Sequence, residues 1–285
     1  MKTLPRFIQI ETNIFCNARC PFCPTEHINR EPKIMDEKVF KKIVDETRGK
    51  GICYRPFLQN EPLTDKRLPE FIKYIKEDNT ALTELNSNGE LLTEEWGKKL
   101  IEAKLDLIRF SVDGISQETI DIARPGLNYK LIEERLIKFS ELVKKSKSSM
   151  KLIIRMIDMD INKHEQAEFK RFWSKYFDDI KIVPLYTWPW HNVNECVLKP
   201  CVKILEEMFF ITSGEAVLCC WDTDARAVIG DVKKQSVSEI WNGEPNQTYR
   251  KYLAKGRRDK ILLCSKCDAY KDREFTDFNG PDYTL

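Results

Sequence analysis

Three cysteines stand within eight residues near the N-terminus, in the stretch NIFCNARCPFC at residues 13–23. Cys16, Cys20 and Cys23 have the spacing Cx3Cx2C, and thiolates at such a spacing bind a soft metal or an iron–sulfur cluster. A fourth protein ligand has two candidates: His27 would complete a zinc site, and Cys53 would complete a cluster of the ferredoxin kind. The loop therefore predicts a metal centre whose fourth ligand has more than one candidate.

A second group of cysteines lies in the last third of the chain. Its candidate ligands are Cys201, Cys219, Cys264 and Cys267. A four-cysteine zinc ribbon normally has two CxxC pairs, whereas this group has one, so zinc is an alternative to an iron–sulfur cluster here. Cys220 could replace Cys219, but neighbouring residues of a strand face opposite sides, and only one of the two can point at a cluster. We expect Cys219 to be the ligand.

The remaining cysteines have no evident partner. Cys53 is expected to be a buried free thiol. Cys196, which precedes Cys201 by five residues, is a candidate for an extra ligand or a catalytic thiol.

The composition is that of a folded protein, and we expect it in the cytoplasm because the sequence has no visible secretory signal or membrane span. Of the 285 residues 42% are hydrophobic, and the formal net charge of +2 gives no electrostatic case for nucleic-acid binding. The N-terminal stretch lacks the apolar core of a secretory signal, and no apolar run approaches a membrane span, so we expect neither secretion nor a membrane partner. In a reducing compartment, ten cysteines indicate metal or redox chemistry rather than disulfides.

Strands and helices alternate up to about residue 185. Apolar runs predict six strands, at residues 7–15, 51–59, 81–89, 105–114, 151–158 and 179–186. Amphipathic helices lie between them, and Asp36 and Thr93 are plausible N-caps of the first and third. Six such alternations predict an α/β fold with a parallel sheet, in the form of an open or partial barrel.

Polar motifs follow four of these strands. The cysteine loop, QNEP at residues 59–62, NSNG at 86–89 and SVDG at 111–114 each come directly after a predicted strand. In parallel α/β folds the chemistry lies at the carboxyl ends of the strands. We therefore expect these four segments to share one rim, although they lie far apart in the sequence.

With these residues in place, the first part of the chain resembles the radical S-adenosylmethionine (SAM) enzymes. The resemblance covers roughly residues 5–185 and rests on the cysteine loop with Phe22 before its last cysteine, on Glu61, on Ser111 and Asp113, and on Arg124. It implies a partial (β/α)6 barrel of the TIM type. It also implies a [4Fe-4S] cluster that three thiolates hold, with SAM as the ligand of the open iron. The family uses this pair to form a 5′-deoxyadenosyl radical that abstracts hydrogen from a C–H bond.

The resemblance assigns the SAM contacts residue by residue. Phe22 would lie near the adenine, and Ser111 would contact the ribose. Arg124 would pair with the SAM carboxylate through a charge-assisted bond. Asn88 matches a strand-end position near the site.

Glu61 would accept a hydrogen bond from the SAM amino group. The family usually has Gly-Gly-Glu-Pro at this place, whereas this chain has Gln59 and Asn60 in the two glycine positions. The close backbone approach that the glycines allow is therefore in question at this point.

Ser213 and Gly214 predict the turn of a hairpin in this part of the chain. The second cysteine group resembles the SPASM/twitch extension of the same family, through the pattern Cx12Gx4C and the IGDV and SEIWN motifs that follow it. No cysteine follows Cys267, so the shorter twitch form with one auxiliary [4Fe-4S] cluster is the better match. The resemblance implies that this cluster transfers electrons or supports the structure. We expect a radical SAM barrel at residues 1–185, an α+β twitch domain at 186–270 and a tail at 271–285.

The short twitch architecture resembles the 2-deoxy-scyllo-inosamine dehydrogenases, which oxidise a secondary alcohol of an aminocyclitol. It implies an oxidoreductase that acts on a carbohydrate-like or amino-sugar small molecule, with a low-potential electron donor such as flavodoxin or ferredoxin. The first strand begins near Phe7, so we expect no fused peptide-recognition domain. The alternatives are modification of a ribosomally made peptide by epimerisation, crosslinking or oxidation, and a non-catalytic zinc or iron–sulfur protein.

The sequence offers only a few candidates for the residues that contact the substrate. Trp188, Trp190 and His191 could stack on a sugar ring, although we expect the tryptophans to pack the domain junction. Arg155 and Asp158, near the end of the fifth strand, could reach the substrate. No residue stands out as a general base.

Overall fold

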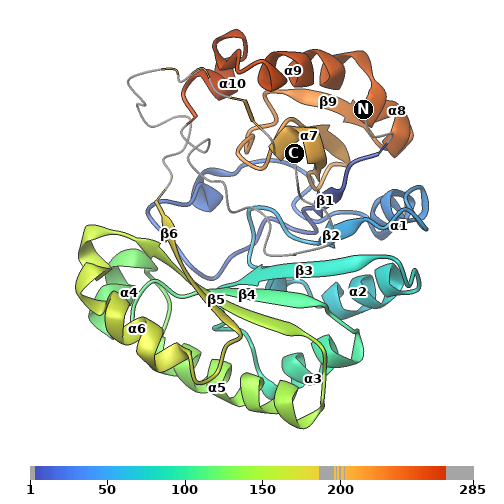
Figure 1. Cartoon of the computed structure of the whole chain (residues 1–285). Helices are drawn as coiled ribbons and strands as arrows, with labels where there is room; N and C mark the ends of the chain where they lie inside the picture. Colours follow the sequence, from blue (N-terminus) through green and yellow to red (C-terminus); the bar gives the residue numbers. More distant parts are fainter. Residues whose placement is uncertain (1–3, 186–195, 197, 199, 202, 268–285) are drawn as a thin grey trace.

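Six parallel strands form the larger part of the structure, as the alternation predicts. The computed structural model of the chain describes residues 4–185, 196, 198, 200–201 and 203–267. The strands lie side by side in the order β6-β5-β4-β3-β2-β1, each parallel to its neighbour (Figure 1). They are β1 (Phe7–Ile10), β2 (Cys53–Arg55), β3 (Leu82–Ser87), β4 (Leu107–Ser111), β5 (Lys151–Asp158) and β6 (Asp179–Pro184).

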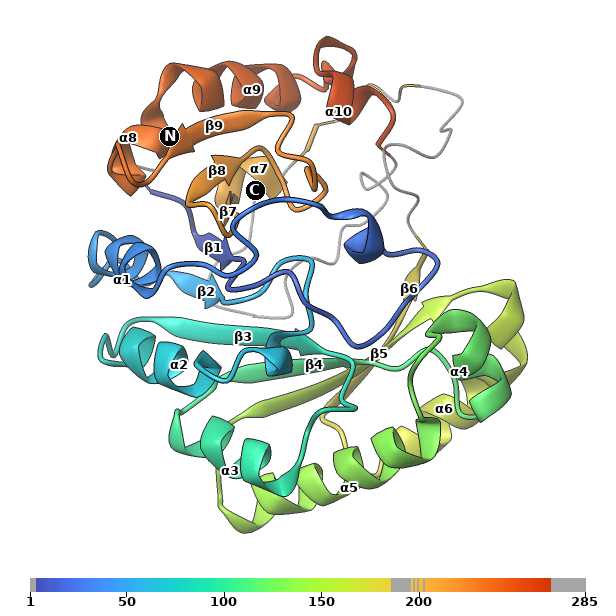
Figure 2. The same ribbon diagram turned by 180° about the vertical axis from the view of Figure 1, so that it is seen from behind.

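Helices connect these strands and cover one face of the sheet (Figures 1 and 2). Asp36 caps the first helix by accepting from the Lys38 N–H at 2.7 Å, and Thr93 caps the third, so both predicted caps are confirmed. The helices are α1 (Glu37–Asp45), α2 (Leu68–Lys76), α3 (Glu94–Glu102), α4 (Gln117–Ala123), α5 (Tyr129–Lys145) and α6 (Gln166–Trp173), with the short 3-10 helices η1 (Thr25–His27), η2 (Pro62–Thr64) and η3 (Asp160–Glu165). The short α4 was not among the predicted elements. None of the described helices is long and apolar enough to cross a membrane.

The later part of the chain adds strands to the same sheet. The predicted hairpin is present, and Gly214 at its turn has a φ of 88°, in the left-handed region that favours glycine. Strand β7 pairs in parallel with β1, so a nine-stranded sheet runs through both predicted domains. The elements are α7 (Lys203–Glu206), β7 (Glu207–Phe210), β8 (Glu215–Val217), β9 (Val228–Asp231), α8 (Val237–Asn242), α9 (Glu244–Ala254), η4 (Arg258–Lys260) and α10 (Leu262–Ser265).

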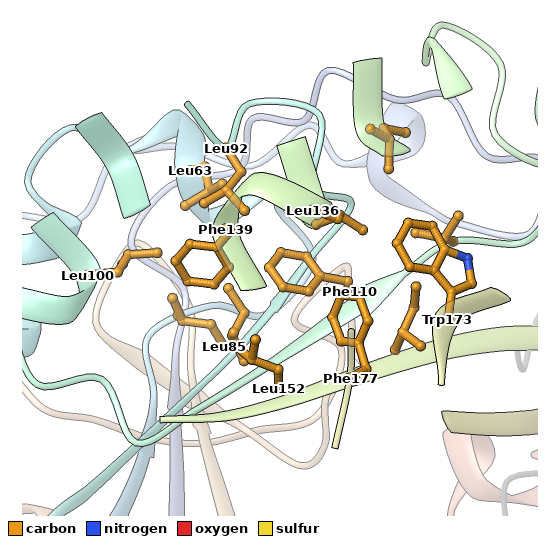
Figure 3. Packing of buried hydrophobic residues seen from close by; sticks show 14 of the residues in the cluster. Leu63, Leu85, Leu92, Leu100, Phe110, Leu136, Phe139, Leu152, Trp173 and Phe177 are labelled. Carbon is orange, nitrogen blue, oxygen red and sulfur yellow. The ribbon is translucent and has the colours of Figure 1, made fainter. Parts of the chain in front are cut away.

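Two large apolar clusters hold the helices on the sheet. In the first, Phe110 of β4 meets Phe139 of α5 edge to face at 6.0 Å between ring centroids, and the fully buried Trp173 of α6 lies nearby (Figure 3). The second cluster combines Phe40 of α1 with Trp241 of α8, so it crosses the boundary between the two predicted domains. The helix-covered face is thus filled with side chains, and the opposite face of the sheet is left for the site.

Candidate functional site

The predicted rim residues line one cavity of about 370 Å³. It lies where the strands β1 to β6 end, and residues just after β8 complete it. All eight residues that the sequence assigned to the cluster and to SAM line this cavity, namely Cys16, Cys20, Phe22, Cys23, Glu61, Asn88, Ser111 and Arg124. Four loops that are distant in the sequence are therefore brought together, as the parallel topology requires.

The three cysteines lie on the loop that follows β1. Cys20 is buried and the other two are half-buried. The Cys23 N–H donates to the Cys20 carbonyl at 2.9 Å, and the Ala18 N–H donates to the Cys16 sulfur at 3.4 Å, so the loop backbone fixes the thiols. Burial raises the pKa of Cys16 to about 12 and also raises the pKa of Cys20. A thiolate in this loop therefore needs a positive charge beside it, which a bound metal supplies.

Glu61 follows β2 and is held by three hydrogen bonds. Its carboxylate accepts from the Leu63 N–H at 3.1 Å, the Ser87 hydroxyl at 2.8 Å and the Asn88 N–H at 2.7 Å. Burial raises the pKa of Glu61 to about 7, and these hydrogen bonds oppose that rise. The carboxylate is thus fixed in direction at the cavity wall and changes its charge near neutral pH.

Arg124 ends the short helix α4 and reaches back toward the cysteine loop. Its Nη2 lies 2.7 Å from the fully buried Asp113 carboxylate, and its Nη1 lies 3.7 Å from the Cys20 sulfur. The guanidinium carbon lies 5.6 Å from the centre of the Phe22 ring. The buried Arg124 Nε has no hydrogen-bond partner among the described residues. The side chain is thus placed between the thiols and an aromatic face, with one buried N–H group that makes no hydrogen bond to the described residues.

The other predicted SAM contacts lie beside it. The Asn88 side chain donates to the Asn17 side chain at 2.8 Å, and the Ser111 hydroxyl accepts from Arg155 Nη2 at 3.1 Å. At the two positions where the family has glycines, Asn60 accepts from the Leu58 N–H at 3.0 Å, and the Gln59 amide donates to the Cys220 carbonyl. These side chains tie the loop after β2 to itself and to the segment after β8.

The candidates for a protein fourth ligand lie elsewhere. His27 is exposed and does not line the cavity. Cys53 is 4% exposed within β2, where burial, with the Glu84 charge next in effect, raises its thiol pKa, so it is the buried thiol that we expected. Asp158 is exposed and accepts from Gln166 at 2.7 Å, so of the two suggested substrate contacts only Arg155 lines the cavity. Trp188, Trp190 and His191 lie outside the described residues.

The second cysteine group lies in apolar surroundings. Cys201, Cys219 and Cys264 pack together in a small cluster with Ile204, Leu218, Ala227, Leu253, Ile261 and Leu263. Burial raises the pKa of Cys219 and of Cys264, and in each the neighbouring Cys267 adds to the rise. Cys220, by contrast, lines the main cavity. The two cysteines come after β8, which ends at Val217, so the strand expected at this point is not present and their different surroundings arise in the turn that follows it. Cys196 is exposed.

Buried charges are the part of the site that the sequence did not predict. Arg55 on β2 lies 2.8 Å from Glu84 on β3 and 3.3 Å from Glu207 on β7, and all three are buried. Glu84 also lies 3.0 Å from Arg109. Arg109, at the centre of the mostly apolar strand β4, is the signal that could have indicated this network, since charged residues are buried only when they are paired.

The donor set of the loop fits an iron–sulfur cluster. Three thiols of one loop face a cavity, and a buried arginine with an unused donor lies beside them. Among the described residues no three His, Cys, Asp or Glu side chains converge on the position of a single metal ion.

Comparisons with known proteins agree with this chemistry. Residues 10–166 match the Radical SAM superfamily, and residues 201–268 match SPASM, an iron-sulfur cluster-binding domain. A tungsten-containing aldehyde ferredoxin oxidoreductase cofactor-modifying protein of Pyrococcus furiosus is 29% identical over 276 residues, which are 90% of this chain and 76% of the relative. A probable GTP 3′,8-cyclase of Methanococcus maripaludis is 32% identical over 128 residues, only 45% of this chain and 43% of the relative.

Solved structures share the fold at low sequence identity. BtrN, a 2-deoxy-scyllo-inosamine dehydrogenase solved with AdoMet and 2-DOIA, has a TM-score of 0.68 at 20% identity, with 94% of each chain covered. SuiB of Streptococcus suis, bound to S-adenosylmethionine, has a TM-score of 0.69 at 13% identity and covers 92% of this chain and 72% of its own. The partial barrel and the predicted family resemblance are thereby confirmed.

Proposed function

This chain belongs to the radical SAM superfamily and carries a SPASM iron–sulfur domain, and on that premise we propose that it oxidises a carbohydrate-like or amino-sugar small molecule. [4Fe-4S] clusters and SAM are the cofactors of these domains. One observation carries the proposal, namely that the three loop thiols and the candidate SAM contacts line the same cavity. The wall also offers amides and hydroxyls, the groups that bind sugar-like molecules.

When bound, a reduced cluster with SAM would supply one-electron reductive cleavage of the sulfonium C–S bond and abstraction of a hydrogen atom from the substrate. Cys16, Cys20 and Cys23 are proposed to hold it by their thiolates. Glu61 receives the SAM amino group because its carboxylate is fixed at the wall and accepts in its ionised form. Arg124 lines the cavity beside the cysteine loop and is proposed to pair with the SAM carboxylate.

The remaining assignments orient the cofactor and separate it from water. Phe22, beside Arg124, offers a ring face to the adenine. Ser111 and Asn88 lie at neighbouring strand ends, where their polar groups can meet the ribose. Holding the reacting atoms in one geometry within a walled cavity is how the protein part of such a site accelerates the reaction.

We assign Cys201, Cys219, Cys264 and Cys267 to an auxiliary cluster. An oxidation releases a second electron after hydrogen abstraction, and an auxiliary cluster held by these cysteines would accept that electron, while a flavodoxin or ferredoxin would supply the first electron. On this assignment the chain divides into the barrel at residues 1–185, the twitch domain at 186–270 and the tail. The apolar packing around these cysteines supports a role away from the substrate.

A second function is modification of a ribosomally made peptide. The observation in its favour is the fold shared with SuiB, which has also been solved bound to the precursor peptide SuiA at a TM-score of 0.63. The similarity is to the fold, at 13% identity, so it gives this function no site of its own. The names of the curated relatives differ in their reactions, and they do not decide between the two.

Anaerobic reconstitution with iron and sulfide tests the proposal. Two four-iron clusters predict about eight Fe per chain and cleavage of SAM to 5′-deoxyadenosine under reducing conditions. Uptake of zinc in place of iron, with no cleavage of SAM, would establish the non-catalytic alternative. Assays of the reconstituted enzyme with polyols and amino sugars, and separately with peptides, then show which of the two kinds of substrate is converted.

A further inference from the structure

Asp113 is a fully buried carboxylate that lies two residues after β4 and does not line the cavity. A carboxylate in such a place is costly unless hydrogen bonds and an opposite charge satisfy it. Asp113 has both, because its Oδ1 accepts from the Ile157 N–H at 2.7 Å and its Oδ2 lies 2.7 Å from Arg124 Nη2. One oxygen is therefore fixed by the backbone of β5, and the other is directed at the guanidinium of Arg124.

The loop that carries Asp113 is held a second time by the 3-10 helix η3. Asn162 of this helix is fully buried, and its side-chain amide donates to the Asp113 carbonyl at 2.9 Å and to the Ile157 carbonyl at 2.8 Å. The side-chain oxygen of Asn162 accepts from the Met159 N–H at 3.0 Å. The position of Asp113 is thus determined by β5 and η3 together.

The short helix α4 is anchored at its start by another buried carboxylate. Glu165, the last residue of η3, is 6% exposed and accepts from the Ile115 N–H and from the Thr119 hydroxyl, each at 2.7 Å. Helix α4 lies beside α6, which follows η3 directly (Figures 1 and 2). Glu165 therefore fixes the first turn of α4, and Asp113 fixes the side chain of Arg124 at the other end.

The guanidinium of Arg124 is the part of this arrangement that reaches the cavity. It lies beside the cysteine loop, with Nη1 at 3.7 Å from the Cys20 sulfur and its carbon at 5.6 Å from the centre of the Phe22 ring. An arginine side chain has several rotatable bonds, so a protein that fixes it in advance removes the entropic cost of ordering it when a ligand binds. The ion pair with Asp113 supplies this preorganisation.

We infer that Asp113 is a positioning residue for SAM, which holds the guanidinium of Arg124 at the place where the SAM carboxylate binds. Glu165 supports it by fixing the start of α4. The inference rests on the proposed function, because it takes Arg124 to be the partner of that carboxylate. Charge alone predicts the opposite effect: a neutral residue at position 113 would leave the positive charge of Arg124 unbalanced and would strengthen its attraction for a carboxylate.

The test uses the reconstituted enzyme and two ligands, SAM and decarboxylated SAM, which keeps the adenosyl, sulfonium and amino groups but lacks the carboxylate. Asp113→Asn should weaken the binding of SAM about tenfold, as measured by calorimetry, and leave that of decarboxylated SAM unchanged. The iron content should stay at about eight per chain. Asp121→Asn makes the same substitution at an exposed residue of α4 and serves as the matched control, with no effect on either ligand.

Glu165→Gln tests the support of α4. It should give the same pattern with a smaller loss, because one side-chain oxygen still accepts hydrogen bonds. If Asp113→Asn fails to take up iron, this variant decides the outcome. Tighter binding of SAM, unchanged binding in both variants, or equal weakening of both ligands would overturn the inference, since the last result indicates a general structural role.

Arg124→Gln separates this inference from the proposed function. It should reduce the preference for SAM over decarboxylated SAM at least tenfold. If the preference survives in Arg124→Gln, Arg124 does not meet the carboxylate, and the assignment of this residue in the proposed function fails. If the preference falls in Arg124→Gln but survives in Asp113→Asn, the proposed function stands and only the positioning role of Asp113 is overturned.

Discussion

The two cysteine groups present the same ligands in opposite surroundings. The loop thiols face a cavity lined by a carboxylate, amides and arginines, whereas the later group is packed among aliphatic side chains. Burial raises the pKa of thiols in both groups, so both need a metal to be held as thiolates. The surroundings, rather than the ligands, are therefore the basis on which we propose chemistry for the first group and electron storage or structure for the second.

The two groups are nevertheless carried by one sheet. The loop follows β1 and Cys219 follows β8, and these strands lie on either side of β7, but β8 is antiparallel to β7 and so ends toward the edge at which β1 begins. Arg30 also joins the two parts, with its Nη1 at 2.9 Å from the buried Glu11 and its Nε donating to the Thr223 carbonyl. One sheet thus sets the separation of the two groups, which is what transfer of an electron between them would need.

The largest expected effect comes from removing the first group alone. Cys16→Ala, Cys20→Ala and Cys23→Ala together should abolish SAM cleavage and leave about four Fe per chain, because the second group holds its cluster independently. Iron analysis and chromatography of 5′-deoxyadenosine measure the two effects. Cys53→Ser is the matched control, expected to keep about eight Fe, since Cys53 lies inside β2 away from the cavity. Complete loss of iron in the triple variant would contradict two separate clusters.

A smaller effect on the iron content should distinguish Cys219 from Cys220, the two adjacent cysteines that follow β8. Cys219→Ser should lower the iron content from about eight to about four per chain, because Cys219 packs with Cys201 and Cys264. Cys220→Ser should leave it at about eight, since that side chain faces the main cavity. The reverse result would identify Cys220 as the cluster ligand. It would contradict the distinction between thiols that face the cavity and thiols that are packed among aliphatic side chains.

The pH dependence of SAM binding tests the polar side of this comparison, namely the role of Glu61 in the cavity beside the first cysteine group. Burial raises the pKa of Glu61 to about 7. The protonated acid cannot serve as the anionic partner of the SAM amino group, so affinity should rise about tenfold between about pH 6 and about pH 8. In Glu61→Gln the affinity should be lower and independent of pH across that range. Calorimetry with SAM measures it.

An exposed glutamate on α3 supplies the control for this measurement. Glu95→Gln changes the same group at a side chain that is 76% exposed, and it should retain the pH dependence of the unaltered enzyme. A profile that is unchanged in Glu61→Gln would mean that another group governs the dependence and that Glu61 does not meet the amino group.

Local patterns were sufficient to predict the fold and the rim of the site. Apolar runs gave the six strands, and Asp36 and Thr93 marked helix starts because their side chains satisfy free N–H groups. Parallel strands end at one edge, so the loops after β1, β2, β3 and β4 had to meet. That geometry made Glu61 and Ser111 predictable as neighbours before any contact was known.

Long-range pairings were not predictable in this way. The pairing of β7 with β1 joins segments about two hundred residues apart, and neither strand carries a local sign of its partner. The same holds for Arg55, whose acidic partners lie on two other strands. The helix α4 has only 7 residues, too few for a clear helical period, so the element that positions Arg124 was missed.

The smallest expected effect tests whether the two regions unfold together. Gly214→Ala forces an alanine to a φ of 88° and places its Cβ 3.1 Å from Val39 of α1, so we expect a loss of about 1–2 kcal/mol in stability. Gly49→Ala has a similar φ of 73° but meets nothing within 4 Å, which makes it the matched control for the strain alone. Thermal unfolding, followed by fluorescence and by the visible absorption of the clusters, should show a larger decrease in Tm for Gly214→Ala. Since β7 pairs with β1, both clusters should be lost in one transition; two separate transitions would mean that the shared sheet does not couple the cavity to the apolar group.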